Sequence, residues 1–248
     1  MSAPMLFREG NRLCLGLQDQ ADAGILTVDF FDSALQHRIA RPLSSESLVK
    51  AMGSRPKATS SHPLTQGLPC QDASAHLIDA TAGLGQDAFI LACAGWYVTM
   101  VEQSPLVHAL LEDGLKRGLE AALEQGNDVM LTNLSRMYLM PASDSQQILQ
   151  DIPQAAVIYL DPMFPEREKS ARVKKNRYLL QQLHGEEAQG ENLLKLALGL
   201  ARKVVVKRPL HAHPLNQIKP SGAISGKTAR FDIYAGAGVG GAVTQANA

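Results

Sequence analysis

The sequence predicts an α/β protein, with a mostly parallel, doubly wound sheet that ends in an antiparallel hairpin and follows a small N-terminal domain. Three observations predict this fold. From residue 75 onward, short apolar runs alternate with helical patterns, which is typical of parallel βαβ units. The first of these runs leads into a glycine-containing turn before a helix, as in nucleotide-binding sheets. With 248 residues and 45% hydrophobic side chains, the chain is large enough for a domain of this kind.

Composition excludes several other classes of protein. The hydrophobic content rules out a disordered, collagen-like or mucin-like chain. The longest charge-free apolar stretch, from Ala88 to Val101, has 14 residues and is too short to cross a bilayer, so we expect no membrane segment. The N-terminus lacks a basic segment followed by an apolar one, and we expect no secretory signal. Three widely spaced cysteines (Cys14, Cys70 and Cys93) predict no disulfide framework or zinc site and favour a cytoplasmic location.

The N-terminal part of the chain differs in pattern from the rest. We expect residues 1–70 to form a small α+β domain with a linker, and residues 71–248 to form the larger domain. Short apolar runs bounded by Asp or Gly predict strands over 13–18 and 24–31. Residues 44–52 predict a short helix capped by its first or second serine. The remaining residues before the larger domain are rich in Ser, Pro and Gly and predict a linker.

The larger domain is predicted as strands separated by helices. Apolar runs predict parallel strands over 75–79, 96–102, 136–143, 156–161 and 203–209. Helical patterns lie between them, over 86–95, 104–125, 145–152 and 190–201. The longest helix has Ser104 at the N-cap and Pro105 at the first helical position, which are two signals of a helix start. Residues 223–236 predict the antiparallel hairpin.

The turn after the first strand is a candidate ligand site, because ligands of such sheets bind outside the carboxyl ends of the strands. The strand ends at Asp79, and Gly83 and Gly85 follow before a helix. Glycines let the backbone approach a ligand closely, and the helix N-terminus offers free N–H groups. The helix opens with Gln86 and Asp87, where a dinucleotide fingerprint would have a third glycine. An acidic residue there repels a pyrophosphate and favours a zwitterionic ligand such as S-adenosylmethionine. A tight turn without a ligand is the alternative.

The second and third strands end in further polar candidates. Glu102 follows Gly85 by 17 residues, at the position where nucleotide-binding folds place a carboxylate that accepts ribose hydroxyls. Ser143 and Asp144 end the third strand, where a side chain can accept the adenine amino group. Both residue types also cap helices, which is the alternative interpretation. Together with the glycine turn, these residues favour S-adenosylmethionine over NAD or ATP.

The fourth strand ends in the most specific motif of the chain, Y-L-D-P-M-F-P. It resembles the [Asn/Asp]-Pro-Pro-[Tyr/Phe] motif of methyltransferases that act on exocyclic or amide nitrogen. Such a nitrogen is a poor nucleophile because its lone pair is conjugated. The Asp161 carboxylate and the Pro162 carbonyl can accept its N–H bonds, hold it in line with the methyl group and stabilise its developing positive charge. Phe164 can stack on a base swung out of its helix. A plain Asp-Pro turn is the alternative.

Charge is segregated along a chain whose net charge is zero. Residues 1–160 hold 10 basic and 17 acidic side chains, whereas residues 161–248 hold 14 and 7. Residues 166–177, directly after the motif, hold six basic side chains against two acidic ones. This pattern favours contacts with RNA phosphates, although a solvated helix face or a salt-bridged contact between the two halves would also account for it. The candidate phosphate contacts are Lys169, Arg172, Lys174, Lys175, Arg177, Lys207 and Arg208. His211 and His213 have no further ligands nearby, so we expect no metal.

Several segments resemble the ribosomal RNA small subunit methyltransferase J family. They are residues 79–89 (DATAGLGQDAF), 101–118, 159–165 (YLDPMFP), 169–175 (KSARVKK), 204–209 and 230–236, with a fainter match over 25–40. The resemblance implies a class I, Rossmann-like methyltransferase fold. It also implies methyl transfer from S-adenosylmethionine to N2 of a guanine in small-subunit (16S) rRNA, either naked or in the assembled subunit. Carried over by position, it adds Gln103 and Asp161 to the residues expected to line the cofactor site.

Two other functions stay open at this point. The Asp-Pro-x-aromatic motif also serves N-methyltransferases that act on DNA or on protein glutamine. A noncatalytic RNA-binding or ribosome assembly factor could retain the same fold. The presence of both Asp161 and Glu102 argues against this second alternative.

Overall fold

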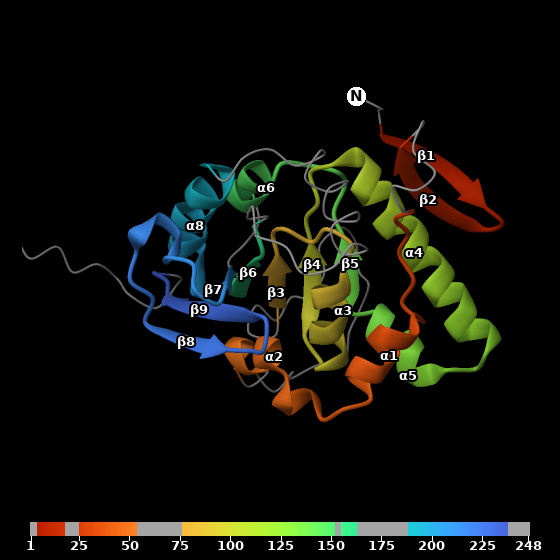
Figure 1. The fold of residues 1–248 in the computed structure, drawn as a ribbon, viewed down its shortest axis with the longest axis horizontal. Helices are drawn as coiled ribbons and strands as arrows, with labels where there is room; N and C mark the ends of the chain where they lie inside the picture. The colour runs from red at the N-terminus through yellow and green to blue at the C-terminus, as the bar shows by residue number, and fades with distance from the viewer. Residues whose placement is uncertain (1–3, 18–24, 54–75, 152–154, 163–187, 238–248) are drawn as a thin grey trace, which may run out of the picture.

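A seven-stranded sheet forms the centre of the protein in the computed structural model, which describes residues 4–17, 25–53, 76–151, 155–162 and 188–237 (Figure 1). The strand order is β5-β4-β3-β6-β7-β9-β8. The pairs from β5 to β7 are parallel, and β9 pairs antiparallel with both β7 and β8. The strands are β3 (His76–Asp79), β4 (Tyr97–Met100), β5 (Met137–Leu139), β6 (Ala155–Leu160), β7 (Ala201–Pro209), β8 (Gly222–Ser225) and β9 (Ala229–Ala235). The predicted mostly parallel sheet with a terminal antiparallel hairpin is confirmed.

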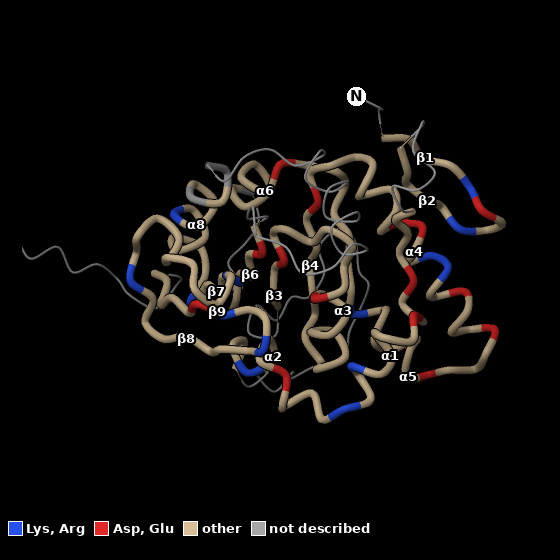
Figure 2. The backbone as a smooth tube through the Cα atoms, in the orientation of Figure 1, with Lys and Arg blue, Asp and Glu red and all other residues tan. Residues whose placement is uncertain are grey.

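The direction of strand addition reverses beside β3. The chain passes from β3 to β4 and then to β5, and it returns to β6 on the other side of β3. In open parallel sheets, ligands bind at such a switch point, outside the carboxyl ends of the strands. The carboxyl end of β3 faces upward in Figure 1, and Figure 2 marks acidic positions close to this edge.

Helices cover both faces of the sheet. Consecutive valines of β7 point to opposite sides, because side chains alternate along a strand. Val205 packs in the same hydrophobic cluster as Leu111, whereas Val204 and Val206 pack in the cluster that contains Leu194. The first cluster lies under α3 (Gln86–Cys93), α4 (Pro105–Glu124) and α5 (Asp128–Leu134), and the second lies under α6 (Ser145–Asp151) and α8 (Ala188–Leu200).

The elements predicted for the larger domain are present in the predicted order. The signals at the start of α4 are confirmed, because Pro105 is its first residue and the Ser104 hydroxyl accepts the N–H of Val107 at 3.5 Å. β3, β4 and β5 are shorter than their apolar runs, and the run over 136–143 yields only the three residues of β5, whereas β7 begins two residues before its predicted start. The seven-residue helix α5 was not predicted.

The N-terminal elements differ more from prediction. They are β1 (Pro4–Glu9), β2 (Arg12–Leu17), α1 (Ser33–Ile39), a 3₁₀ turn (Leu43–Ser45) and α2 (Ser47–Met52). The strand predicted over 13–18 is β2, but β1 and α1 were not predicted. The strand predicted over 24–31 is wrong, because only Leu26 makes a bridge, to Leu15. The predicted helix begins later than expected, after Glu46, because the serines before it form the 3₁₀ turn.

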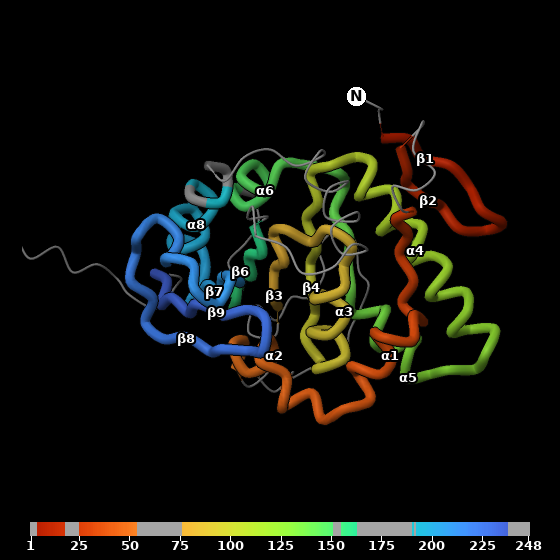
Figure 3. Tube along the Cα trace, in the orientation of Figure 1, coloured from red at the N-terminus to blue at the C-terminus, as the bar shows by residue number. Residues whose placement is uncertain are grey.

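The N-terminal segment packs into the first hydrophobic cluster. Leu26 and Phe30 are buried there together with Leu111, and the rings of Phe30 and Phe89 lie 5.1 Å apart. Figure 3 shows the segment running beside α4 and then beneath the sheet, where α2 lies against β8 and β9. The Lys203 ammonium donates to the carbonyl of Met52 at 3.0 Å. The boundary predicted near residue 70 lies outside the described residues and stays a prediction.

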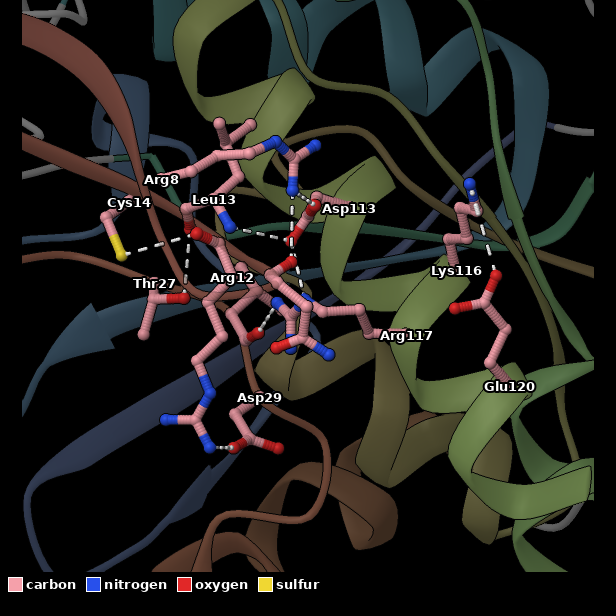
Figure 4. Close-up of polar contacts among 12 residues, drawn as sticks. Arg8, Arg12, Leu13, Cys14, Thr27, Asp29, Asp113, Lys116, Arg117 and Glu120 are labelled. Atoms are coloured by element: carbon pink, nitrogen blue, oxygen red, sulfur yellow. Dashed lines mark hydrogen bonds and ion pairs between the residues drawn. The ribbon is translucent and has the colours of Figure 1, made fainter. Parts of the chain in front are cut away.

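One carboxylate on α4 fastens the β1–β2 hairpin. Asp113 accepts the backbone N–H of Leu13 at 3.1 Å, and it forms ion pairs with Arg8 at 3.2 Å and with Arg117 at 2.6 Å (Figure 4). Arg117 also donates to the carbonyl of Val28 at 2.6 Å. Because Asp113 and Arg117 are largely buried, this cluster fixes both the hairpin and the following segment on α4.

Candidate active site

The glycine turn after β3 has the conformation that its sequence predicts. Gly83 and Gly85 have φ values of +54° and +72°, a left-handed region that side chains strongly disfavour. A Cβ on Gly85 would lie 2.6 Å from Cδ1 of Leu111, because α4 packs closely there. A Cβ on Gly83 would meet nothing closer than the Thr81 carbonyl oxygen, at 4.0 Å. Gly85 therefore packs tightly against the core, whereas the space beside Gly83 is free of close protein atoms.

Glu102 lies against this turn with its carboxylate almost fully buried, at 2% exposure. Its Oε2 accepts the N–H of Gly83 at 2.9 Å, and its Oε1 accepts the N–H of Ser104 at 2.7 Å. A carboxylate has about four acceptor positions, so its oxygens can also accept protons from ribose hydroxyls. An open glycine turn beside a buried carboxylate fits the hydroxyls and the positive charge of S-adenosylmethionine.

The remaining candidate cofactor residues lie along the same edge of the sheet. Asp79 is buried at the end of β3, where its Oδ1 accepts the N–H of Thr81 at 3.1 Å. Burial raises the pKa of Asp79 to about 8, and the charges of Asp87 and Asp161 act in the same direction. Gln86 is exposed on the first turn of α3, and Gln103 is half-buried next to Glu102.

The two candidates after β5 make local bonds. Asp144 is exposed, and its carboxylate accepts the N–H of Gln146 at 2.8 Å at the start of α6. The Ser143 hydroxyl donates to the carbonyl of Pro141 at 2.9 Å. Asp144 therefore acts as a helix cap, which was the alternative interpretation of this residue.

A cluster of charged and hydroxyl side chains joins the start of α3 to the end of β6. This Lys207 cluster consists of Lys207, Asp87, Asp161, Tyr159 and Arg38. The Lys207 ammonium donates to Oδ2 of Asp87 and to Oδ2 of Asp161, each at 2.8 Å. The Tyr159 hydroxyl donates to Oδ2 of Asp87 at 2.7 Å, and Arg38 lies 3.6 Å from its Oδ1. The sequence predicted Asp87 and Asp161 as site residues but not Tyr159 or Arg38.

The electrostatics of the cluster favour its charged forms. Burial by itself would raise the pKa of Asp87, but the charge and hydrogen bond of Lys207 outweigh it and hold that pKa below its usual value. Burial likewise opposes the charged form of Lys207, yet Asp87 and Asp161 raise its pKa. Burial raises the pKa of Tyr159 well above its usual value, so its hydroxyl stays protonated and can donate a hydrogen bond. At neutral pH the cluster contains a bridging cation between two carboxylates.

The backbone around Asp161 is fixed from two sides. The Asp161 N–H donates to Oγ1 of Thr81 at 2.6 Å, which ties the motif to the turn after β3. A Cβ on Gly190 would lie 2.9 Å from Cβ of Pro162, so the start of α8 packs directly on this proline. The third predicted catalytic residue, Phe164, lies outside the described residues.

The structure places the predicted phosphate-binding residues in two groups. Lys207 bridges two carboxylates, and Arg208 is 6% exposed and donates to the carbonyl of His213 at 2.6 Å and 3.1 Å. For these two, the structure shows internal partners where the sequence predicted phosphates. The other five lie outside the described residues and stay predictions: Lys169, Arg172, Lys174, Lys175 and Arg177.

The described residues contain neither a metal-binding cluster nor a membrane-spanning helix. Within that part of the chain, no three His, Cys, Asp or Glu side chains are grouped so as to hold a metal ion. No helix among the described residues has the length and apolar character needed to span a membrane.

Comparisons with known proteins show which family the chain belongs to. A family model described as "Putative SAM-dependent methyltransferase" matches residues 2–236. Ribosomal RNA small subunit methyltransferase J of Saccharophagus degradans is 49% identical over 166 residues, which are 64% of this chain and 62% of that protein, so the match spans less than two thirds of its length. The protein of the same name from Thioalkalivibrio sulfidiphilus is 41% identical over 234 residues, 93% of this chain and 84% of that protein.

A solved structure extends the similarity to the fold. The crystal structure of a SAM-dependent methyltransferase from Neisseria gonorrhoeae matches with a TM-score of 0.66 at 29% identity, covering 96% of this chain and 85% of that one. The family model and this structure thus agree on the fold and on the cofactor. The chain belongs to the ribosomal RNA small subunit methyltransferase J family of SAM-dependent methyltransferases.

Proposed function

We propose that this protein transfers a methyl group from S-adenosylmethionine to the exocyclic N2 of a guanine in small-subunit ribosomal RNA. The names of its relatives support this class of RNA. The observation that carries the reaction type is the placement of Asp161. Its carboxylate lies at the switch point of the sheet, and its backbone is tied to the glycine turn through Thr81. A hydrogen-bond acceptor for the target nitrogen therefore lies next to the cofactor turn.

Of the residues along the strand ends, one group binds the cofactor in this proposal and the other binds the substrate. In this proposal Glu102 accepts the ribose hydroxyls, and the open backbone at Gly83 receives the cofactor. When bound, S-adenosylmethionine supplies an electrophilic methyl group on a positively charged sulfur. The other proposed lining residues are Asp79, Gly85, Gln86, Gln103, Ser143 and Asp144. Asp87 also belonged to the predicted set, but its contacts with Lys207 and Tyr159 favour a different role.

The motif acts on the nucleophile. The Asp161 carboxylate and the Pro162 carbonyl accept the two N–H bonds of the guanine amine and orient its nitrogen toward the methyl group. Both oxygens carry negative charge or a negative dipole end, so they stabilise the positive charge that develops on the nitrogen. The amine becomes acidic only as the methyl group arrives, so water can take the proton and no general base is required. Phe164 stacks on the base in this proposal.

The proposal is tested with purified protein, S-adenosylmethionine and small-subunit rRNA from a strain that lacks the gene. The RNA is supplied both deproteinised and in assembled subunits, and nucleosides are identified by mass spectrometry. We expect N2-methylguanosine with the wild-type protein. We expect about a 100-fold or greater loss of rate with Asp161→Ala, which is comparable to removing one transition-state hydrogen bond elsewhere.

The other candidate functions are outcomes of the same experiment. Methylation of DNA or of a glutamine peptide in place of rRNA contradicts the proposal, as does another methylated nucleoside. A wild-type protein that binds S-adenosylmethionine and methylates none of these substrates points to the noncatalytic assembly factor. Isothermal titration with the cofactor confirms that each variant remains folded and able to bind.

A further inference from the structure

Lys207 joins the Asp161 carboxylate of the substrate motif to the Asp87 carboxylate of α3. Its ammonium lies 2.8 Å from Oδ2 of Asp161 and 2.8 Å from Oδ2 of Asp87. The Asp161 side chain is 36% exposed and Asp87 is 16% exposed, so Asp161 is the carboxylate that faces outward. A substrate nitrogen can therefore reach Asp161 while Lys207 holds its other side.

Asp87 is held firmly on its own side of Lys207. Tyr159, which is fully buried, donates its hydroxyl proton to Oδ2 of Asp87 at 2.7 Å. Arg38 of α1 lies 3.6 Å from Oδ1 of Asp87, and it also pairs with Glu46 at 3.1 Å. With both oxygens engaged, Asp87 acts as a fixed anchor for the Lys207 ammonium.

The charged and titratable groups near Lys207 come from α3, α1 and the carboxyl ends of β6 and β3. Asp87 and Arg38 face it from α3 and α1, and Asp161 and Tyr159 from the end of β6. Asp79 at the end of β3 is buried nearby, and its pKa of about 8 makes it neutral at neutral pH. On β9, Arg230 and Asp232 flank Phe231, which is the partner of Lys207 in the strand pairing, so they point to the opposite face of the sheet, where they pair with each other at 2.7 Å. Lys207 thus brings a positive charge into direct contact with the Asp161 carboxylate.

We propose that Lys207, anchored by Asp87, is a positioning residue that orients the Asp161 carboxylate toward the target amine and keeps it ionised. Ionisation matters because a carboxylate only accepts hydrogen bonds, whereas a protonated carboxyl group also donates one and would oppose the N–H of the substrate. A nearby cation favours the ionised form. This inference rests on the proposed function, since it assigns the nucleophile-binding role to Asp161.

The test compares Lys207→Met with Lys207→Arg in rRNA methylation across a range of pH. Removing the cation makes the carboxylate easier to protonate, so we expect the acid limb of kcat for Lys207→Met to move up by about one pH unit or more. We also expect kcat at neutral pH to fall by about 10-fold or more. Lys207→Arg keeps the charge and should restore the wild-type acid limb. The Kd for S-adenosylmethionine should change less than about 2-fold in both variants.

Lys203→Met is the matched control. Lys203 lies on the same face of β7, but its ammonium donates to the backbone carbonyls of Ala51 and Met52. This variant should keep the wild-type pH profile. A Lys207→Met enzyme with the wild-type acid limb and a uniformly lower rate would overturn the proposal, because a merely structural role lowers the rate equally at every pH.

A second variant covers the case in which Lys207→Met does not fold. Asp87→Asn keeps Lys207 but weakens its anchor, and it should lower kcat while leaving the affinity for S-adenosylmethionine unchanged. Weaker cofactor binding with an unchanged kcat would instead make Asp87 a cofactor ligand, as the sequence predicted, and would overturn its role as an anchor. A wild-type protein that does not methylate rRNA contradicts the proposed function itself, so the two failures are distinguishable.

Discussion

Glu102 is the residue on which the cofactor site depends most directly. Its buried carboxylate holds the N–H of Gly83 and, in our proposal, the ribose hydroxyls. Glu102→Ala should weaken S-adenosylmethionine binding by about 1–3 kcal/mol, the usual cost of leaving polar groups without an acceptor. Isothermal titration measures the change, with Glu112→Ala on the exposed face of α4 as the control. An unchanged affinity would remove Glu102 from the site.

Asp79 makes the stability of the protein depend on pH. Its pKa is about 8 in the folded protein against 3.8 without burial, so folding favours the protonated form. Its contribution is therefore fully present below about pH 4 and is lost as the pH rises through 8. Asn at this position is neutral throughout, so Asp79→Asn should become progressively more stable than the wild type between pH 4 and pH 8.

Urea unfolding of the two proteins across that pH range measures the difference. Burial lowers the pKa of His76 to about 4, but this residue is present in both proteins and its effect cancels. A stability difference that stays constant with pH would show that Asp79 is ionised in the folded protein at all these values.

At the scale of elements, replacing two helical glycines by alanine should change the stability of the protein in opposite directions. A Cβ on Gly114 of α4 would lie 2.6 Å from Cβ of Val28, so the N-terminal segment would have to move away from the helix. Gly114→Ala should cost about 1–3 kcal/mol of stability through overpacking. Gly199 of α8 has no neighbour within 4 Å, so Gly199→Ala should stabilise the protein by about 0.5–1 kcal/mol through helix propensity alone. Thermal and urea unfolding distinguish the two, and a stabilising Gly114→Ala would mean that this contact is loose.

The boundaries of elements were predicted best where local signals are strong. Ser104 and Pro105 begin α4 as their residue types predict, and the alternation of β7 places its valines on opposite faces. The seven-residue helices α1 and α5 were not predicted, although α6 has the same length and was, so short length alone does not explain the omission. A capping signal was nonetheless present for α1, since the Asp32 carboxylate accepts the N–H groups of Ala34 and Leu35.

For the whole molecule, the segregated charge predicts how RNA binding responds to salt. Removing one protein–phosphate interaction with a single strand reduces the slope of log K against log salt by about 0.7. A Lys174→Ala, Lys175→Ala double variant should therefore bind rRNA more weakly and with a shallower slope. Its affinity for S-adenosylmethionine should stay the same. Titrations at several salt concentrations test this, and parallel slopes would show that these lysines are only solvated surface.

The site shows where inference from sequence stops. Asp79, Glu102 and Asp161 could be predicted because each ends an apolar run, and the ends of parallel strands meet at one edge. The contacts within the Lys207 cluster could not be predicted, because its members come from segments far apart in the chain and meet only when the sheet forms. A lysine near the end of a strand has the same local sequence pattern whether it faces RNA or two carboxylates. Only tertiary contacts decide between the two.

The position of β9 has a consequence for biosynthesis. This strand is made last of the described strands, yet it lies between β7 and β8 and pairs with both. Just after it, the N–H of Gly236 donates to the carbonyl of Arg202 at 3.0 Å, which closes the chain against the start of β7. While the ribosome still holds these residues, β7 presents an open edge to the surrounding solution. Premature termination before residue 229 would make that open edge permanent, and such an edge is a template for aggregation.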